Sequence, residues 1–285
     1  MHLSRVSLPP LIVILVIIGG CSPAAPPREN VTPTNTILPT ESPSPVPTSL
    51  PATPVEPTAT SLPTPVPPTS TPDVPFEEVN FTTEDGISIA ATLFGNGQPA
   101  ILLLHMGKGK ATGNDQQDWH PFARTLAEQG FSALAVDFRG RGASGGEFVN
   151  DPVVLDARAA LDFLHQRGYS DYICMGAGLG GTTCMVLALT DPPQGLVILS
   201  SSMSVGPANQ VTEADLVKLK MPKLFLYGEK DAFGFPEAMQ NIYRRAAEPK
   251  ALLTCDSAAH GTTLLYGSCG QEIDQRILDF IQEFK

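Results

Sequence analysis

The 285-residue sequence lacks both a long apolar run and an excess of basic residues. Its apolar run near the N-terminus, Leu11 to Ile18, has eight residues, which is too short to span a bilayer as a helix. Lys and Arg number 18 against 29 Asp and Glu, giving a net charge of −11. This balance argues against nucleic acid and anionic lipid headgroups as partners, because both are negatively charged.

Clustered metal ligands are also absent from the sequence. The five His residues are scattered, and no acidic or Cys residues accompany them at the spacing of a metal site. The glycines that follow Gly176 do not match a phosphate-binding loop, since they fit a different strand-turn-helix motif described below. We therefore expect neither a metal nor a cofactor.

Proline is unevenly distributed, and this divides the chain. Seventeen of the 28 prolines lie between Ser22 and Pro75, in a stretch of Pro, Thr and Ser with almost no aromatic residues. Such a composition cannot bury enough apolar surface to offset the cost of ordering. Residues 22–75 are predicted to be a disordered tether, reaching roughly 160 Å at about 3.1 Å per residue if extended. Residues 76–285 have the size of one globular domain.

The N-terminal segment has the features of an export signal. Arg5 precedes the apolar run, which ends in the sequence Ile18-Gly19-Gly20-Cys21. This sequence resembles a bacterial lipobox, in which cleavage before the Cys leaves its thiol free for lipidation. Residues 1–21 are thus predicted to be a lipoprotein signal peptide with Cys21 as the lipidated residue, and simple secretion is the alternative. The expected location is extracytoplasmic, with the lipid anchor as the only membrane contact.

After Pro75 short apolar runs alternate with amphipathic stretches, which predicts an α/β domain with a mostly parallel sheet. A first hairpin is expected around Asp85-Gly86. The other expected strands are 100–105, 132–137, 172–176, 195–200, 223–228 and 251–254. The expected helices are 119–129, 153–167, 180–189, 236–247 and 272–284. Ligands bind at the carboxyl ends of parallel strands, so the loops that begin at these ends should surround one crevice.

One of these loops has the pattern of a catalytic turn. Residues 173–181 read Ile-Cys-Met-Gly-Ala-Gly-Leu-Gly-Gly, a strand that passes through a glycine turn into a helix. The pattern resembles the nucleophile elbow G-x-S-x-G at every position except that of the Ser, where Gly178 stands.

Four further motifs resemble the same family in the same order. Leu104-His105-Met106-Gly107 resembles its oxyanion loop, and the segment from Asp137 to Ser144 resembles D-x-R-G-x-G-x-S. Tyr227 to Asp231 resembles the segment that carries the catalytic acid, and Ala259-His260-Gly261 resembles the histidine segment. The domain is identified as similar to the α/β-hydrolase-fold family, closest to dienelactone-hydrolase-like esterases and lipases. The resemblance implies the α/β-hydrolase fold, with helices on both faces of the sheet. Only some twenty residues separate two expected strands between Ser200 and Met221, so little or no lid is expected.

The resemblance also implies residue roles. His260 would be the general base, Asp231 would hold its tautomer, and the backbone N–H groups of Leu179 and Met106 would form the oxyanion hole. Gly178 takes the place of the nucleophile and provides none. A nucleophile relocated to residues 200–202 is a minor alternative. For Asp231 and His260, a hydrogen-bonded pair without activity is an equally open alternative to a working dyad.

Besides Cys21, four Cys residues lie in a domain expected to be exported, where disulfides form. Cys255 with Cys269 would brace the loop of His260. Cys174 with Cys184 would link the strand before the elbow to the following helix. For the latter pair, buried free thiols are an equally open alternative.

Two functions from different classes remain open. The first is a hydrolase in which the Asp231–His260 dyad activates water on a small ester-like substrate without an acyl intermediate. The second is a catalytically inactive pseudohydrolase that binds a small ligand. We expect a monomer whose partners are small molecules.

Overall fold

The computed structural model describes residues 74–107 and 114–285 of the chain. The predicted signal peptide, Cys21 and the tether up to residue 73 lie outside the described residues. Within the described part, no helix is long and apolar enough to cross a membrane.

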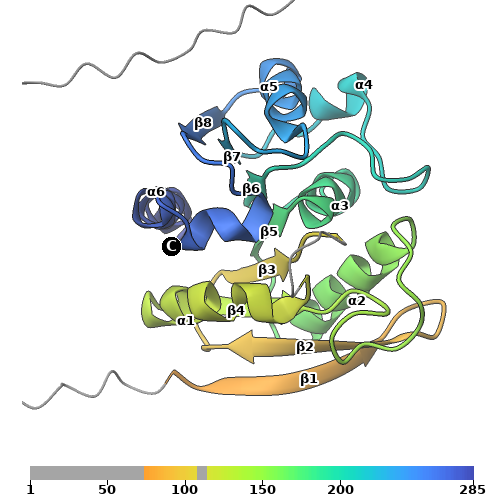
Figure 1. The fold of residues 1–285 in the computed structure, drawn as a ribbon. Helices are drawn as coiled ribbons and strands as arrows, with labels where there is room; N and C mark the ends of the chain where they lie inside the picture. The colour runs from red at the N-terminus through yellow and green to blue at the C-terminus, as the bar shows by residue number, and fades with distance from the viewer. Residues whose placement is uncertain (1–73, 108–113) are drawn as a thin grey trace, which may run out of the picture. The chain divides into compact units, whose positions relative to one another are not determined.

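The described residues form an eight-stranded mixed sheet (Figure 1). In space the strands follow the order β1-β2-β4-β3-β5-β6-β7-β8. The β1–β2 and β2–β4 pairs are antiparallel, and all other pairs are parallel. The strands are β1 (Phe76–Thr82), β2 (Ser88–Phe94), β3 (Ala100–Leu104), β4 (Ser132–Val136), β5 (Tyr172–Ala177), β6 (Gly195–Leu199), β7 (Lys223–Gly228) and β8 (Lys250–Cys255).

Helices cover both faces of this sheet. Helices α2 (Val153–Gln166), α3 (Leu179–Leu187), α4 (Glu213–Leu216) and α5 (Phe235–Arg245) pack on one face. Helices α1 (His120–Glu128) and α6 (Gly270–Gln282) pack on the other. This arrangement confirms the predicted α/β-hydrolase fold, in which sequential crossovers of one hand place helices on each side of a parallel sheet.

The core lies between the sheet and these two helical layers. Every residue of β3 and β6 is buried, as their continuous apolar runs predict for strands covered on both faces. Along β3 the side chains alternate, so that Leu102 packs with the α2 and α3 layer and Leu103 with the α1 and α6 layer. Burying each such side chain stabilises the fold by about 1.5–3 kcal/mol, an upper range before entropy is counted.

Three short elements were not expected from the sequence. They are the 3₁₀ turns η1 (Gln116–Trp119) and η2 (Gly261–Tyr266), and the single-turn helix α4. Each is too short to show a hydrophobic period, although Thr212 and Asp215 do form a capping box at α4. The β6–β7 connection, which carries α4, otherwise has only the isolated bridge between Ser204 and Gln210. It provides no large lid.

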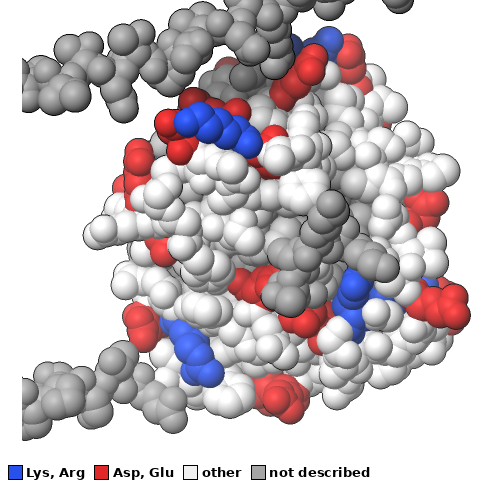
Figure 2. Space-filling model, viewed as in Figure 1, with Lys and Arg blue, Asp and Glu red and all other residues white. Residues whose placement is uncertain are grey.

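Charged side chains are spread over the surface of the domain. On the face shown in Figure 2, basic side chains occur singly or beside acidic ones, and most of the visible described surface is uncharged. Several exposed charges are paired, among them Arg167 with Glu77 at 2.8 Å and Lys230 with Asp256 at 2.5 Å. Such exposed pairs contribute little stability, about 0–1 kcal/mol each.

Candidate active site

The turn between β5 and α3 has the backbone of a nucleophile elbow. Gly178 has φ 51° and ψ −114°, and its N–H donates to the carbonyl of Leu199 at 2.8 Å. A non-glycine residue at such a positive φ is strained by about 1–3 kcal/mol, whereas glycine adopts it freely. A Cβ at Gly176 or Gly180 would collide with backbone of the facing segment, so these glycines permit the close crossing of strand and helix.

His260 and Asp231 form a hydrogen-bonded pair beside this turn. His260 lies just after β8 and Asp231 just after β7, and His260 Nδ1 lies 2.7 Å from Asp231 Oδ2. The other carboxylate oxygen of Asp231 accepts the N–H of Phe233 at 3.0 Å. Because the carboxylate accepts from Nδ1–H, Nε2 of the neutral imidazole is left as the basic nitrogen.

The backbone of His260 is held by a neighbouring hydroxyl. The His260 N–H donates to Thr263 Oγ1 at 2.9 Å, and the same hydroxyl donates to the His260 carbonyl at 2.7 Å. Phe233 and Phe235 lie against the imidazole ring, with centroid distances of 4.9 and 4.6 Å. The Asp231 carboxylate and the two aromatic side chains therefore hold the ring, and the Thr263 hydroxyl holds the backbone of His260.

The basic nitrogen faces the elbow. A Cβ placed on Gly178 would lie 3.2 Å from His260 Nε2 and 3.2 Å from the Met106 Cβ. His260 is thus directed at the place where a side chain of residue 178 would project. This is the base-to-nucleophile geometry of a hydrolase triad, with glycine in place of the nucleophile.

Two backbone amides are available next to the same place. Leu179 begins α3, so its N–H is one of the helix's N-terminal donors without an intrahelical acceptor. Met106 follows β3, and its side chain contacts the elbow. Within the described part of the chain neither N–H has a hydrogen-bond partner. Both residues line the hollow beside Gly178, so their amides are available as candidate oxyanion donors.

A hollow of about 320 Å³ opens over Gly178 and His260. Its described lining residues are Met106, Gly107, Phe148, Asn150, Gly178, Leu179, Val205, Phe233, Phe235 and His260. Among these residues there is no hydroxyl, thiol or carboxylate. The described part of the hollow therefore contains a base and free amides but no side-chain nucleophile.

The serines that follow β6 are not among the described lining residues of this hollow. Ser201 donates to the Leu199 carbonyl at 3.1 Å, and Ser202 donates to the Ser204 carbonyl at 2.9 Å. Ser200 is fully buried, has a positive φ of 43°, and does not line the hollow. These are hydrogen bonds to nearby backbone, as expected if the serines stabilise a turn and do not act as nucleophiles.

Two polar residues near the crevice have structural roles. Burial lowers the pKa of His105 to about 4, so the ring is neutral. Its Nδ1 lies 2.7 Å from the Met106 carbonyl, and its Nε2 accepts the Phe138 N–H at 3.1 Å. Asp137 accepts two bonds from Gln116 and one from the Ala143 N–H, which fixes the loop after β4.

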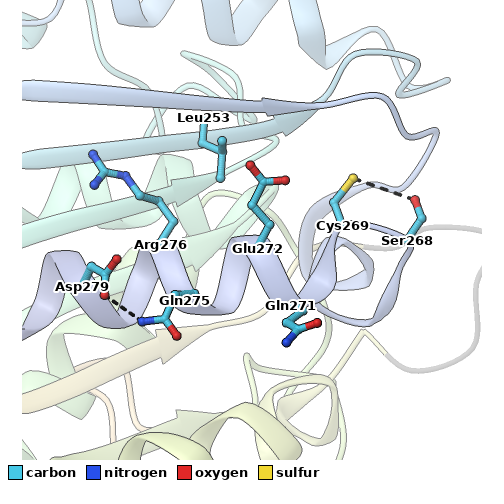
Figure 3. A pocket seen from close by; sticks show the side chains of 8 residues that line it. All are labelled: Leu253, Ser268, Cys269, Gln271, Glu272, Gln275, Arg276 and Asp279. Carbon is cyan, nitrogen blue, oxygen red and sulfur yellow. Dashed lines mark hydrogen bonds between the residues drawn. The ribbon is translucent and has the colours of Figure 1, made fainter.

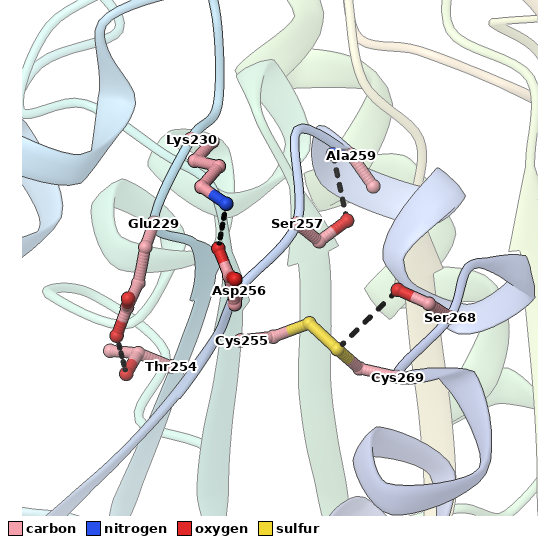
Figure 4. Close-up of a disulfide and its surroundings, with 9 residues drawn as sticks. All are labelled: Glu229, Lys230, Thr254, Cys255, Asp256, Ser257, Ala259, Ser268 and Cys269. Atoms are coloured by element: carbon pink, nitrogen blue, oxygen red, sulfur yellow. Dashed lines mark hydrogen bonds and ion pairs between the residues drawn. A yellow bond between two sulfur atoms is a disulfide. The ribbon is translucent and has the colours of Figure 1, made fainter. Parts of the chain in front are cut away.

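Both candidate cysteine pairs are disulfides in the structure. Cys255 ends β8 and Cys269 precedes α6, so their bond closes the segment that carries His260 (Figure 4). The other bond, between Cys174 and Cys184, joins β5 to α3 on either side of the elbow, and both cysteines are fully buried. One disulfide thus closes the loop of the base and the other closes the turn of Gly178.

A larger hollow, of about 610 Å³, lies away from this chemistry. It is an open depression beside the Cys255–Cys269 bond, where Arg276 and Glu272 project from α6 toward Leu253 of β8 (Figure 3). It is solvent-facing and holds no base paired with free amides, so volume alone does not identify the functional site here. Across the described residues, no group of three His, Cys, Asp or Glu side chains is placed to hold a metal ion.

Sequence reasoning missed the apolar wall of the site. Phe148, Val205 and Phe233 come from three different loops and Phe235 begins α5, and no local period marks them. The sequence Phe-Gly-Phe directly after Asp231-Ala232 was an available signal, because two aromatic residues beside a catalytic acid are unusual for a solvent-exposed loop. Thr263, which holds the His260 backbone, carried no such signal.

Comparisons with known proteins give matches in sequence and in fold. Residues 100–214 match the sequence model of the family described as serine aminopeptidase, S33. The uncharacterized protein Rv2307c of Mycobacterium tuberculosis is 26% identical over 246 residues, covering 77% of this chain and 83% of that protein. The uncharacterized protein YfhR of Escherichia coli O157:H7 is 24% identical over 209 residues, covering 65% and 73%.

Solved esterase structures share the fold. The esterase Pf2001 of Pyrococcus furiosus superposes with a TM-score of 0.62 at 20% identity, covering 74% of this chain and 93% of that one. Est1E of Butyrivibrio proteoclasticus, solved with ferulic acid bound, gives a TM-score of 0.60 at 18% identity, covering 71% and 98%. Together with the strand order and the elbow, these structures support the α/β-hydrolase fold of the described residues.

Proposed function

We propose that this protein cleaves a small ester-like substrate with His260 as a general base that acts directly on water, without an acyl-enzyme intermediate. The observation that carries the proposal is the orientation of His260 Nε2. It faces the space above Gly178 and beside Met106, while Nδ1 is held by Asp231. A base beside free oxyanion donors can activate water for attack on a polarised carbonyl even where no side-chain nucleophile is present.

The proposed reaction proceeds as follows. The substrate carbonyl oxygen accepts from the N–H groups of Met106 and Leu179, which polarises the carbonyl carbon. His260 Nε2 takes a proton from water as the water oxygen bonds to that carbon. When the tetrahedral intermediate collapses, the bond to the leaving alkoxide breaks, and His260 returns the proton to it. Asp231 stabilises the imidazolium between these two steps.

The experiment is ester turnover by the purified full chain, with p-nitrophenyl acetate as the probe. His260→Ala is expected to lower the turnover by about a hundredfold to ten-thousandfold, the usual contribution of general-base catalysis. His165→Ala is the matched control, because His165 lies on the exposed side of α2. Equal turnover by native protein and His260→Ala would rule out the dyad mechanism.

A second candidate function is ligand binding without catalysis, and Gly178 is the observation that favours it. Glycine relaxes a turn that strains any other residue, so a protein with no use for the hydroxyl would gain stability there. If the folded native chain turns over no ester but binds a small ester or carboxylic acid in the hollow, as seen by NMR shifts of the His260 ring, this candidate replaces the first.

We place this activity outside the cytoplasm, on a lipid anchor at Cys21. The support is the apolar run that ends in Gly19-Gly20-Cys21 and the Pro-rich tether after it. Metabolic labelling with a palmitate analogue tests the anchor. Label should be lost in Cys21→Ala, and label that persists in this variant contradicts the assignment.

A further inference from the structure

The two disulfides of the described domain differ in their exposure to solvent. Cys174 and Cys184 are both fully buried. Cys255 is also buried, at 6% exposed, but Cys269 is only partly buried and lines the open hollow of about 610 Å³. A reductant in solution can therefore approach the Cys269 sulfur, whereas neither sulfur of the other bond is open to solvent. Exposed disulfides are commonly the labile and regulatory ones, because thiol exchange requires access to a sulfur atom.

The hollow gives a reductant room beside this bond. Figure 3 shows Cys269 at one end of the hollow, with the side chains of α6 along the rest of it. Its volume lies within the range of about 300–1,000 Å³ that small-molecule sites have. The Ser268 Oγ lies 3.8 Å from the Cys269 Sγ (Figure 4). A hydroxyl in that position can donate to a thiolate on Cys269, which favours the charged form that thiol exchange produces.

The same bond joins the end of an edge strand to the helix that follows the His260 segment. In the described sheet β8 is the last strand and pairs only with β7. The residues of β8 before Cys255 are each only partly buried. Asp231 follows β7 and His260 follows β8, so the dyad bridges the ends of these two strands. By tying the end of β8 to Cys269, directly before α6, the disulfide limits how far His260 can move from Asp231.

Other contacts hold the two parts of this disulfide loop unequally. After His260, the turn η2 inserts Leu264 and Leu265 into the core, where both are buried. Between Cys255 and His260, residues 256–259 belong to no helix or strand and are exposed or only partly buried. Segments with few buried contacts are the first to open locally. Loss of the disulfide should therefore free the short arm that carries His260, while the leucines keep the domain folded.

We propose that the Cys255–Cys269 bond is a redox switch for the base: a dithiol reduces it at the Cys269 sulfur, the contact between His260 and Asp231 loosens, and activity falls. This inference rests on the proposed general-base function of His260 and adds its regulation. Such a switch keeps the base in place in an oxidising compartment, where the bond persists, and releases it where dithiols are present.

The exchange balances in atoms and electrons. A thiolate of the dithiol attacks the Cys269 Sγ, and the electron pair of the S–S bond leaves on Cys255, which takes a proton. The second thiol of the dithiol then attacks the dithiol's own sulfur in the mixed disulfide and releases Cys269 as a thiol. The dithiol loses two electrons and two protons and becomes a disulfide, and the protein gains two thiols. The reverse exchange with a disulfide closes the switch again.

The test is a titration of the full chain, with both bonds formed, with dithiothreitol under native conditions. One portion of each sample is alkylated and mapped by mass spectrometry, and another is freed of reductant and assayed with p-nitrophenyl acetate. The Cys255–Cys269 bond should be reduced at least about tenfold faster than the Cys174–Cys184 bond. Turnover should fall at least about threefold in step with it, and oxidised glutathione should restore the turnover.

Two double variants assign the effect to one bond. Cys255→Ala/Cys269→Ala lacks the switch, so its turnover should equal that of the reduced native protein and should not respond to dithiothreitol. Cys174→Ala/Cys184→Ala is the matched control, because its bond closes a similar span, 10 residues against 14. It should lose the same fraction of its turnover on reduction as the native protein. Native turnover that is unchanged once Cys255–Cys269 is reduced, or faster reduction of the buried bond, overturns the switch.

The failure of this inference is distinguishable from the failure of the proposed function. Turnover that depends on His260 but does not respond to reduction leaves the hydrolase proposal intact and refutes the switch. If no ester is turned over, the NMR resonances of the His260 ring nitrogens decide, because they report the contact between Nδ1 and Asp231. A change in these resonances on reduction of the native chain, absent from Cys255→Ala/Cys269→Ala, supports the switch without the chemistry. Resonances that stay the same in the reduced native chain refute it.

Discussion

The candidate site has a histidine side, around His260, and an elbow side, at Gly178. The histidine side has the side chains that a catalytic base requires, and the elbow side lacks the side chain of a nucleophile. On the histidine side, His260 is held by the Asp231 carboxylate, the Thr263 hydroxyl and two phenylalanine rings. On the elbow side, the backbone has the turn that a nucleophile requires, yet Gly178 presents no side chain. Each side is closed by its own disulfide.

The two sides also differ in the contacts that hold their backbone in place. Ordering a loop in one conformation costs about 1–2 kcal/mol per residue in backbone entropy, which the contacts around His260 must offset. At the elbow, glycine adopts the backbone conformation without strain, and the turn is held by the bond from the Gly178 N–H to the Leu199 carbonyl and by the Cys174–Cys184 disulfide. In the structure the side-chain contacts are therefore concentrated around His260, and the elbow presents no nucleophilic side chain.

Restoring the nucleophile should produce the largest change. Gly178→Ser places a hydroxyl beside His260 Nε2, and the variant should react with a fluorophosphonate probe, whereas the native protein should not. The Ser Cβ would lie only 3.2 Å from both Nε2 and Met106 Cβ, and its φ is strained, so unfolding should become easier by about 1–3 kcal/mol. Intact-mass spectrometry measures the adduct.

Gly178→Ala is the control for that experiment, since it adds the Cβ but no nucleophile, and it should stay unlabelled. Labelling of the native protein would reveal a nucleophile elsewhere, and residues 200–202 would be mapped first. A folded Gly178→Ser variant that stays unlabelled would show that the elbow side no longer aligns with the base, in favour of the ligand-binding alternative.

Removing the charge that holds His260 should have the next largest effect. Asp231→Asn keeps the shape of the side chain but loses the stabilisation of the imidazolium, and ester turnover should fall by about a hundredfold or more. Asp256→Asn is the matched control, because Asp256 lies in the same segment as His260 but is exposed and pairs with Lys230. Equal losses in the two variants would assign the effect to general disturbance of the loop.

The two disulfides allow a direct comparison of the two sides. The bonds span 14 residues for Cys255–Cys269 and 10 for Cys174–Cys184. Loop entropy predicts similar contributions to the free energy of unfolding, about 3 kcal/mol each. We expect the Cys255→Ala/Cys269→Ala and Cys174→Ala/Cys184→Ala pairs to lose similar stability in urea. At a temperature where both are folded, the first pair should lose more turnover, because its bond closes the His260 loop.

The sequence predicted most of the fold, but only some of the residues that form the candidate site. Strands β3, β5, β6 and β7 are continuous apolar runs bounded by turn residues, so their positions and their burial were both predictable. The dyad and the glycine elbow were predictable as well, because these motifs occupy fixed places at the carboxyl ends of successive strands. In the structure His260 bonds to Asp231, and it lines one hollow with Gly178, Leu179 and Met106.

The walls of the site were not predictable, and the reason is physical. Phe148, Val205 and Phe233 reach the hollow from loops whose paths depend on long-range contacts, such as the bond from Asn150 Nδ2 to the Val205 carbonyl at 3.0 Å. A sequence of 285 residues shows local periods and turn residues, but it does not show which loops meet. The aromatic contacts on the His260 ring are a consequence of such a meeting, because they need both the Asp231 loop and the His260 loop in place.

A smaller effect is expected on the helix that follows the histidine side. Burial raises the pKa of Asp274 on α6 to about 6, from an ordinary value of 3.8, and within the described residues its Oδ1 is buried without a hydrogen-bond partner. A raised carboxyl pKa in the folded state means that the protonated form is preferred there. Its contribution to stability is therefore complete below about pH 4 and is lost as the pH rises through about 6.

Asp274→Asn should consequently raise the free energy of unfolding at pH 8 relative to the native protein, and the gain should shrink between pH 6 and pH 4. We expect a gain of about 1 kcal/mol, below the full value of the pKa shift because the half-buried carboxylate is partly screened by solvent. Urea unfolding at several pH values measures it, with Asp279→Asn on the exposed side of the same helix as the control. Because α6 begins directly after Cys269, turnover should also be recorded. A gain in stability with unchanged turnover would show that the residues that position His260 do not extend past the Cys255–Cys269 disulfide. A change in turnover would show that α6 also helps to position His260.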